Sequence, residues 1–347
     1  MPVAEEIERA LEDWYGFGDT GGAVAAVGLG DGSVHIAFVG DGAPGEPAQP
    51  DDLMRIGSIT KTYIAALALR LDDAGLLDID DPVTVYLADL AIESSVTIRD
   101  LMAHMSDIVD PDSEMLIGLI LQDPGRRFEV EELLGLTEFP TTAADRTGEF
   151  TYANSNYLVL GRVIEAVTGT DIVTTLRREI LEPAELMHTH LAGAETIPDP
   201  IVPGNVDLDG DGREESLVGI PYLAIESAAW VAGAMVSTPD DLIGFARALF
   251  AGQLISDGAL AEMTGNDDLE GTGTGAGLGI FDLGIEGRTS YGNSGAAPGF
   301  AANFAHDLDG GTTAVVFTNC PSCAAGGNDT WQLLVDLLAI ADTEPTG

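Results

Sequence analysis

A serine and a lysine three residues apart are the residues of this sequence best suited to covalent chemistry. Ser58 and Lys61 lie in residues 55–63, directly before the apolar helical pattern of residues 64–71. Residues i and i+3 share one face of a helix, so the spacing predicts that the Ser58 hydroxyl and the Lys61 amine lie close together. An amine beside a hydroxyl can take its proton and make it a nucleophile. The alternative role for Ser58 is to cap the helix that follows.

Lys61 is the only lysine of the chain, beside thirteen arginines. A guanidinium does not release its proton in a protein, whereas an amine can do so once burial has removed it from water. A lysine kept against this bias indicates a function that needs a neutral amine. The composition therefore favours a catalytic base at Lys61 over an ordinary surface cation.

Acidic residues outnumber basic ones by 58 to 14, which gives a net charge of −44 at pH 7. The acids recur along most of the chain, whereas a patch that binds a partner would be local. Such a surface is typical of a protein that works in molar salt, where charge repulsion is screened. We expect halophilic adaptation, with a basic or calcium-rich partner as the alternative. Nucleic acid is not expected as a partner, since phosphate contacts need a basic surface.

The chain has 347 residues, of which 45% are hydrophobic and 21% charged, and this predicts a globular protein with room for two subdomains. No stretch reaches 18 uncharged apolar residues, so no membrane span is predicted. Residues 1–16 place Val3, Ile7, Leu11 and Trp14 on one helical face and lack the basic start of a signal peptide. The chain as given is expected to be cytoplasmic.

The order of the predicted elements indicates an α+β fold. Two apolar runs joined by a Gly-Asp-Gly-Ser turn predict a β-hairpin near the amino end. We predict an antiparallel sheet flanked by helices on both faces, built from residues 1–81 and 224–347, with residues 82–223 as an inserted, mainly helical subdomain. The predicted strands are residues 22–29, 34–39, 230–236, 277–283, 289–293, 300–306 and 312–318. The predicted helices are residues 1–16, 58–75, 98–105, 114–121, 130–134, 157–168, 172–180, 242–250 and 331–340.

Several blocks of this layout resemble the serine β-lactamase and penicillin-binding-protein superfamily. The resemblance points to the branch with class C β-lactamases, D-alanyl-D-alanine carboxypeptidases, D-aminopeptidases and related esterases. It runs over residues 20–335 and rests on motifs in the same order at similar spacing. Ser58 and Lys61 form the first motif, and Tyr152 and Asn154 form the Tyr-x-Asn of the second. Further blocks match at residues 96–106, 232–238 and 291–300.

The resemblance implies a β-lactamase-like fold and an acyl-enzyme mechanism with Ser58 as the nucleophile. It places Tyr152 beside Ser58 and Lys61, where the phenol passes a proton to the leaving group as a general acid–base partner. It also implies that the backbone N–H groups of Ser58 and Ala296 form the oxyanion hole. Asn154 projects to the same side as Tyr152 in an extended segment and can bond a substrate amide. No cofactor is required for this chemistry, and the implied partner is a small-molecule substrate.

The third motif of the family differs here. Related proteins usually carry Lys-Thr-Gly or His-x-Gly beside the site, and their cation meets a substrate carboxylate. This chain has Asn293-Ser294-Gly295, and an asparagine donates hydrogen bonds without bringing charge. We expect Asn293 and Gly295 to bind the substrate of a serine hydrolase for small esters, amides or D-amino-acid derivatives. The alternatives are a β-lactamase, a D-aminopeptidase or carboxypeptidase, and a non-catalytic scaffold.

Asp207, Asp209 and Asp211 form Asp-x-Asp-x-Asp-Gly, which is the first half of a calcium loop. The twelfth position of an EF-hand loop would be Val218 in place of glutamate, so a complete EF-hand is excluded. A looser calcium cage that uses Glu215 and a solvated turn both remain as interpretations of this motif.

Three short motifs are interpreted as non-catalytic. His188 and His190 have no third ligand nearby in the sequence, so a zinc site is not expected. Cys320 and Cys323 are too few for a four-thiolate metal site and are expected to be a plain pair of thiols or a local disulfide. Residues 271–279 are glycine-rich without a phosphate-binding lysine, which predicts a loop near the site rather than a nucleotide cradle. The sequence does not define the oligomeric state.

Overall fold

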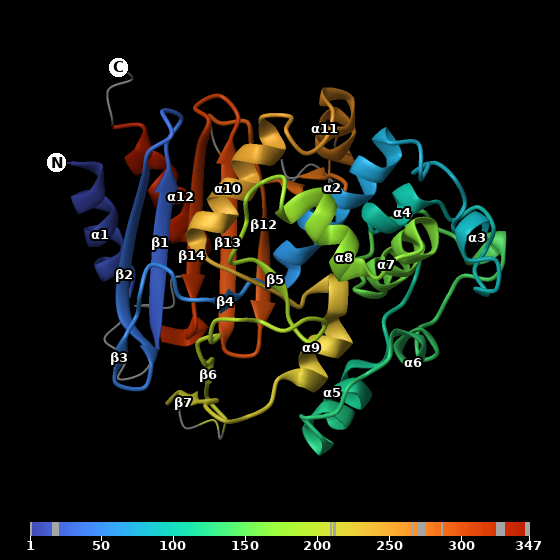
Figure 1. The fold of residues 1–347 in the computed structure, drawn as a ribbon, viewed down its shortest axis with the longest axis horizontal. Coiled ribbons are helices and arrows are strands. Elements are labelled where there is room, and N and C mark those ends of the chain that lie inside the picture. Colours follow the sequence, from blue (N-terminus) through green and yellow to red (C-terminus); the bar gives the residue numbers. More distant parts are fainter. Residues whose placement is uncertain are drawn as a thin grey trace.

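The computed structural model describes residues 2–15, 21–208, 210, 213–265, 267–268, 275–285, 287–323 and 330–343. Among these residues, the main sheet is antiparallel with the order β3-β2-β1-β14-β13-β12-β11-β10-β9 (Figure 1). Its strands are β1 (Gly22–Gly28), β2 (Val34–Ala43), β3 (Glu46–Pro47), β9 (Asp267–Asp268), β10 (Gly275–Ala276), β11 (Phe281–Asp282), β12 (Ser290–Ala297), β13 (Phe300–Asp307) and β14 (Thr312–Thr318).

Helices cover both faces of this sheet, which confirms the predicted fold class. Two helices, from the start and the end of the chain, pack together on one face (Figure 1). Two others share the larger core on the opposite face. The first pair is α1 (Val3–Trp14) and α12 (Thr330–Ala341), and the second is α2 (Thr60–Asp73) and α10 (Pro239–Phe250).

Strand β1 lies between these two cores and contributes to both. Alternate side chains of a strand point to opposite faces. Val24 and Ala26 join the core of α2 and α10, whereas Ala23 and Val27 join the core of α1 and α12. A strand that is buried on both faces reads as a continuous apolar run, and this explains the uninterrupted pattern in the sequence.

A group of short helices lies beside the sheet, in the region predicted to be an inserted subdomain (Figure 1). They share the larger core with α2, and the boundaries of the subdomain stay a prediction. The helices are α3 (Val83–Tyr86), α4 (Ile98–Met102), α5 (Ser113–Gln122), α6 (Val130–Leu134), α7 (Ser155–Thr168) and α8 (Ile172–Leu176), which continues as a π-helical segment (Arg177–Leu181).

Smaller elements complete the described chain. Three strands form a second sheet in the order β4-β8-β5, and two more form a pair. The strands are β4 (Met54–Arg55), β5 (His190–Leu191), β6 (Asn205–Val206), β7 (Glu215–Ser216) and β8 (Met235–Ser237). The remaining helices are α9 (Leu223–Ala229) and α11 (Asp257–Thr264), and the 3-10 turns are η1 (Gly57–Ile59), η2 (Ala143–Asp145), η4 (Trp230–Ala232) and η5 (Pro321–Cys323).

Two strand predictions are wrong over part of their length. Residues 230–236 begin as the 3-10 turn η4 and become strand β8 only at Met235. Of residues 277–283, only Phe281–Asp282 form a strand, which is β11. Short apolar runs do not distinguish a buried strand from a buried turn by periodicity, and this ambiguity is the reason for both errors.

Two further sequence expectations concern covalent and membrane structure. Cys320 and Cys323 form a disulfide, which decides between the two interpretations of this pair. Within the described ranges, no helix has the length and hydropathy needed to cross a lipid bilayer. The expected cytoplasmic location stays a prediction.

Candidate active site

The three side chains predicted to be catalytic meet at one oxygen atom. Ser58 lies in the turn η1, and Lys61 lies in the first turn of α2. Lys61 Nζ is 3.1 Å from Ser58 Oγ, and the Tyr152 hydroxyl donates to the same Oγ at 2.7 Å. The i, i+3 spacing therefore brings the amine to the hydroxyl, although this segment begins as a 3-10 turn rather than as the α-helix predicted from residue 58.

Lys61 has a defined partner for each of its protons. Its side chain is 1% exposed, and Nζ also donates to Asn154 Oδ1 at 2.8 Å and to the Ala232 carbonyl oxygen at 2.7 Å. An ammonium has three donors, which match these two oxygens and Ser58 Oγ. A neutral amine keeps two N–H donors for Asn154 and Ala232 and leaves its lone pair for the Ser58 hydroxyl. The same site thus accommodates both protonation states.

Burial controls the protonation of this amine. Desolvation lowers the pKa of Lys61 to about 7, and the Asp110 carboxylate acts in the opposite direction. Burial disfavours the charged form of an amine because the protein interior solvates a cation poorly. The neutral amine is therefore accessible near neutral pH, the form that a general base needs.

The pKa of Tyr152 changes in the opposite direction to that of Lys61. The burial of its hydroxyl raises the pKa of Tyr152, partly offset by the hydrogen bond to Ser58, and the charge of Asp110 adds to the rise. The phenol therefore keeps its proton at neutral pH and acts as a donor. Part of the ring is open to solvent, with 42% of the residue exposed, so a substrate has access to this side of the site.

His104 supports the segment that carries Tyr152, a role that sequence reasoning missed. Its ring stacks on the Tyr152 ring with 4.3 Å between centroids. Its Nδ1 accepts from the Ala153 backbone N–H at 3.3 Å, and its carbonyl accepts from the Thr151 N–H at 2.8 Å. Burial, followed by the nearby charge of Lys61, lowers the pKa of His104 to about 3, so the ring is neutral. The sequence signal for this role is the position of His104 within residues 96–106, a block that resembles a family motif.

Two glycines allow strand β12 to approach the Ser58 turn. A Cβ at Gly295 would lie 1.9 Å from the Ile56 carbonyl oxygen and 2.7 Å from the Ser58 nitrogen. A Cβ at Gly57, whose φ is +49°, would lie 2.5 Å from the Ala296 nitrogen. Only residues without a side chain permit this contact. The Ser58 turn and residues 295–296 of β12 are thereby in close contact, and the oxyanion hole from the N–H groups of Ser58 and Ala296 stays a prediction.

Asn293 is turned into the protein interior. It is 6% exposed, and its Nδ2 donates to Thr62 Oγ1 at 3.1 Å and to the Gly279 carbonyl at 3.3 Å. Its Oδ1 accepts from the Ser294 N–H at 2.8 Å. The carboxamide therefore joins β12 to α2, and a substrate contact by this side chain stays a proposal.

Arg55, the basic residue next to the Ser58 turn, is paired with a carboxylate. Arg55 donates to Glu226 Oε1 at 2.6 Å, and its guanidinium lies 3.7 Å from the centre of the Tyr222 ring. Lys61 is committed to its three oxygens. The charge of Arg55 is therefore compensated by Glu226, while its buried Nε has no hydrogen-bond partner among the described residues.

The predicted calcium loop lies only partly within the described residues. Asp209 and Asp211 lie outside the described residues, and Asp207 accepts from the Gly210 N–H at 2.7 Å. No group of three potential metal ligands occurs among the residues that the structure describes, so the calcium prediction receives no support. His190 Nδ1 lies 2.7 Å from an Arg177 nitrogen.

The glycine-rich segment is described only from residue 275 onward. There Gly279 accepts from Thr62 Oγ1 at 2.8 Å and donates to the Met102 carbonyl at 3.1 Å. This part of the segment therefore borders α2 close to the site, as the sequence predicts.

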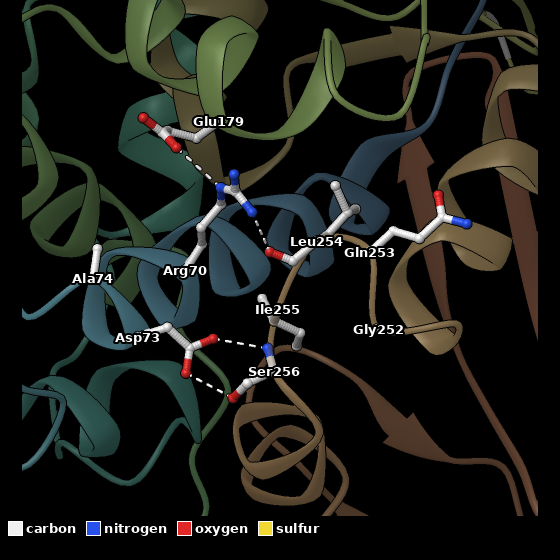
Figure 2. Close-up of a pocket in the computed structure, with 9 residues that line it drawn as sticks. All are labelled: Arg70, Asp73, Ala74, Glu179, Gly252, Gln253, Leu254, Ile255 and Ser256. Atoms are coloured by element: carbon white, nitrogen blue, oxygen red, sulfur yellow. Dashed lines mark hydrogen bonds and ion pairs between the residues drawn. The ribbon is translucent and has the colours of Figure 1, made fainter.

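A cavity of about 400 Å³ lies at the other end of α2 (Figure 2). Arg70, nine residues after Lys61, is about 13 Å further along the helix axis. It pairs with Glu179 at 2.9 Å and donates to the Leu254 carbonyl at 2.7 Å, and Asp73 accepts from the Ser256 N–H at 2.8 Å. These polar groups satisfy one another, so this cavity offers no reactive group.

Comparisons with known proteins place the chain in a family. A family model described as Beta-lactamase matches residues 7–339. A Bacillus subtilis (strain 168) protein named as a penicillin-binding protein, PbpX, is 28% identical over 80% of this chain, and the match spans 66% of that relative. A D-stereospecific amidohydrolase from a Streptomyces species has 26% identity and a TM-score of 0.79, with 96% of each chain covered.

A D-amino acid amidase from Ochrobactrum anthropi SV3 has the same fold, with 23% identity, a TM-score of 0.81 and 99% of each chain covered. Two of these similar proteins are hydrolases by name, and the comparisons are consistent with a serine hydrolase. Since the family model matches nearly the whole length, the chain belongs to the Beta-lactamase family.

Proposed function

We propose that this protein hydrolyses small esters or amides through an acyl-enzyme formed on Ser58. The observation that carries the proposal is the position of Ser58 Oγ, 3.1 Å from Lys61 Nζ and 2.7 Å from the Tyr152 hydroxyl. A nucleophile with a base and an acid in direct contact is the arrangement that acyl transfer needs.

The proposed reaction begins when the neutral Lys61 amine takes the proton of Ser58. The serine oxygen then forms a bond to the substrate carbonyl carbon, and the negative charge on the carbonyl oxygen is stabilised by the N–H groups of Ser58 and Ala296. The bond between the carbonyl carbon and the leaving group then breaks as Tyr152 gives its proton to the leaving group. The Lys61 ammonium returns a proton to the tyrosine oxygen and becomes neutral again. Water then takes the place of the leaving group and attacks the acyl carbon, with the proton transfers running in reverse. The ester bond to Ser58 breaks and the serine oxygen regains its proton.

The charges of the site favour a substrate without a carboxylate at the reacting end. Asn293 brings no charge to the third motif, and Lys61 and Arg55 are both occupied. A neutral acyl group or one that bears an ammonium group, as in D-amino acid amides and esters, meets no uncompensated repulsion here. The names of the D-stereospecific amidohydrolase and the D-amino acid amidase support this class.

A β-lactamase or D-peptidase activity is the second candidate, and the name of the penicillin-binding relative favours it. Such substrates carry a carboxylate, and the charge of Arg55, the cation next to the Ser58 turn, is already compensated by Glu226. A non-catalytic scaffold is a weaker candidate, because Ser58, Lys61 and Tyr152 are all present and in contact.

The test is labelling with a fluorophosphonate probe in molar salt, followed by a substrate panel. We expect wild-type protein to be labelled and Ser58→Ala to be unlabelled, with Ser294→Ala as the matched control on an exposed neighbouring serine. The panel contains p-nitrophenyl acetate, D-alanine and D-phenylalanine p-nitroanilides, their L-isomers and nitrocefin. Turnover of nitrocefin alone would favour the second candidate, and the absence of both label and turnover would overturn the hydrolase proposal.

A further inference from the structure

We propose that Asp110, which no motif of the sequence singles out, is a positioning residue that acts on Lys61 through Asn154 and through its own charge. The inference rests on the proposed function, because it assigns Asp110 a part in the reaction at Ser58. Asp110 lies in the segment between α4 and α5 and contacts the start of α7.

The amino end of α7 is capped in an unusual way. Asn154 occupies the N-cap position, where an asparagine side chain normally accepts from the first free backbone N–H groups of its own helix. Its side chain makes no such bond here, since Oδ1 accepts from Lys61 Nζ at 2.8 Å instead. The capping is supplied by Asp110, whose Oδ2 accepts from the Asn154 N–H at 2.9 Å and whose Oδ1 accepts from the Ser155 N–H at 2.7 Å.

These two bonds hold the backbone of Asn154, the residue whose carboxamide oxygen accepts from Lys61. If the Asp110 carboxylate is removed, two backbone N–H groups at the positive end of α7 lose their acceptor. The backbone of Asn154 would then lose the contact that holds it in place, and its carboxamide would no longer be held on Lys61. Asp110 thus fixes the base indirectly, without touching the reacting atoms.

The charge of Asp110 has a second effect on the same amine. The groups that face Lys61 include the rings of Tyr152 and Tyr157, centred 4.8 and 5.6 Å from Nζ. Burial raises the pKa of both phenols, and His104 is neutral with a pKa of about 3. Asp110 is the carboxylate that raises the pKa of Lys61 against the effect of burial. Removal of its charge should therefore lower the pH at which the amine becomes a base.

The test compares the pH dependence of kcat/KM for Asp110→Asn and Asp110→Ala with wild type. Asp112→Asn is the matched control, because Asp112 caps α5 by accepting from the Met115 N–H at 2.8 Å and has no bond to α7. We expect the plateau to fall roughly ten- to a hundredfold in Asp110→Ala and less in Asp110→Asn, as for other groups that orient a reacting side chain. We also expect the acid limb to move to lower pH in both, and to stay in place in Asp112→Asn.

The outcomes separate the inference from the proposed function. If wild type shows no serine-dependent activity, the proposed function fails. If wild type is active but the acid limb of both Asp110 variants coincides with that of wild type, Asp110 has only a structural role and the inference is overturned. Circular dichroism establishes that each variant is folded, and Asp110→Asn, which preserves the size of the side chain, serves if Asp110→Ala does not fold.

Discussion

Lys61 and Tyr152 contact the same Ser58 oxygen, while the amine of Lys61 also lies 4.8 Å from the centre of the Tyr152 ring. Burial changes their pKa values in opposite directions, downward for the amine and upward for the phenol. Two titratable groups whose environments separate their pKa values are suited to act as base and acid at one pH. At neutral pH this pair therefore offers one base and one acid to the same nucleophile.

The activity of the enzyme should have an acid limb with a midpoint near pH 7. The pKa of Lys61 is lowered to about 7, so below this pH the ammonium predominates and cannot take the Ser58 proton. kcat/KM should fall by about tenfold per pH unit on the acid side and reach a plateau above pH 8. A profile measured from pH 5 to 9.5 checks this, and a flat profile would contradict Lys61 as the base. His104 has a pKa of about 3 and does not titrate in this range.

Lys61→Arg should remove most of the activity while leaving the positive charge in place. A guanidinium keeps its proton at every pH of the assay and cannot act as a base. We expect kcat to fall by about 10²- to 10⁴-fold. Arg70→Lys, at the other end of the same helix, is the control and should retain wild-type kcat. Full turnover in Lys61→Arg would show that the base lies elsewhere.

Tyr152→Phe should lower kcat while leaving the protein folded. It removes the hydroxyl that donates to Ser58 Oγ at 2.7 Å, and a positioned acid contributes about 10²- to 10⁴-fold. Tyr157→Phe is the matched control, because the Tyr157 hydroxyl donates to the Met102 carbonyl at 3.1 Å rather than to the nucleophile. That variant should lose about 1 kcal/mol of unfolding free energy with little change in kcat. Equal losses of kcat in the two variants would deny Tyr152 a specific role.

Gly295→Ala should impair catalysis more than stability. The new Cβ would lie 1.9 Å from the Ile56 carbonyl oxygen and would force β12 away from the Ser58 turn. A displaced oxyanion-hole donor typically costs about 10²- to 10³-fold in kcat. Gly118→Ala, at a helical glycine with no neighbouring atom within 4 Å of the new Cβ, should leave kcat unchanged. Steady-state kinetics of the two variants decide the matter, and an active Gly295→Ala would argue against this oxyanion hole.

The free energy of unfolding should rise with salt concentration. A net charge of −44 repels itself, and the Debye length shortens from about 10 Å at 0.1 M salt to about 3 Å at 1 M. Urea denaturation in 0.1, 1 and 3 M NaCl measures the effect, with equal osmolality of sucrose as the control for excluded-solute stabilisation. Stability that is unchanged or lower in salt would contradict halophilic adaptation.

Much of the sheet could be predicted from sequence because its strands have strong local signals. β14 occupies the predicted residues 312–318, and β13 extends one residue beyond its predicted end. The four apolar positions of α1 are buried as its helical period indicates. Residues 230–236 could not be assigned in the same way, because the turn η4 depends on its packing against α7 rather than on its own pattern.

For the active site, the sequence by itself determined the pairing of Ser58 with Lys61, since a separation of three residues within one helical turn leaves the two side chains together. The resemblance to a family predicted Tyr152 beside this pair, and tertiary structure alone decided the other contacts. Asn154, Ala232 and Asp110 come from segments far along the chain, and the inward orientation of Asn293 follows from the bonds it makes to α2 and Gly279. The pKa of Lys61 belongs to this second class, because it depends on how completely distant segments exclude water from one amine.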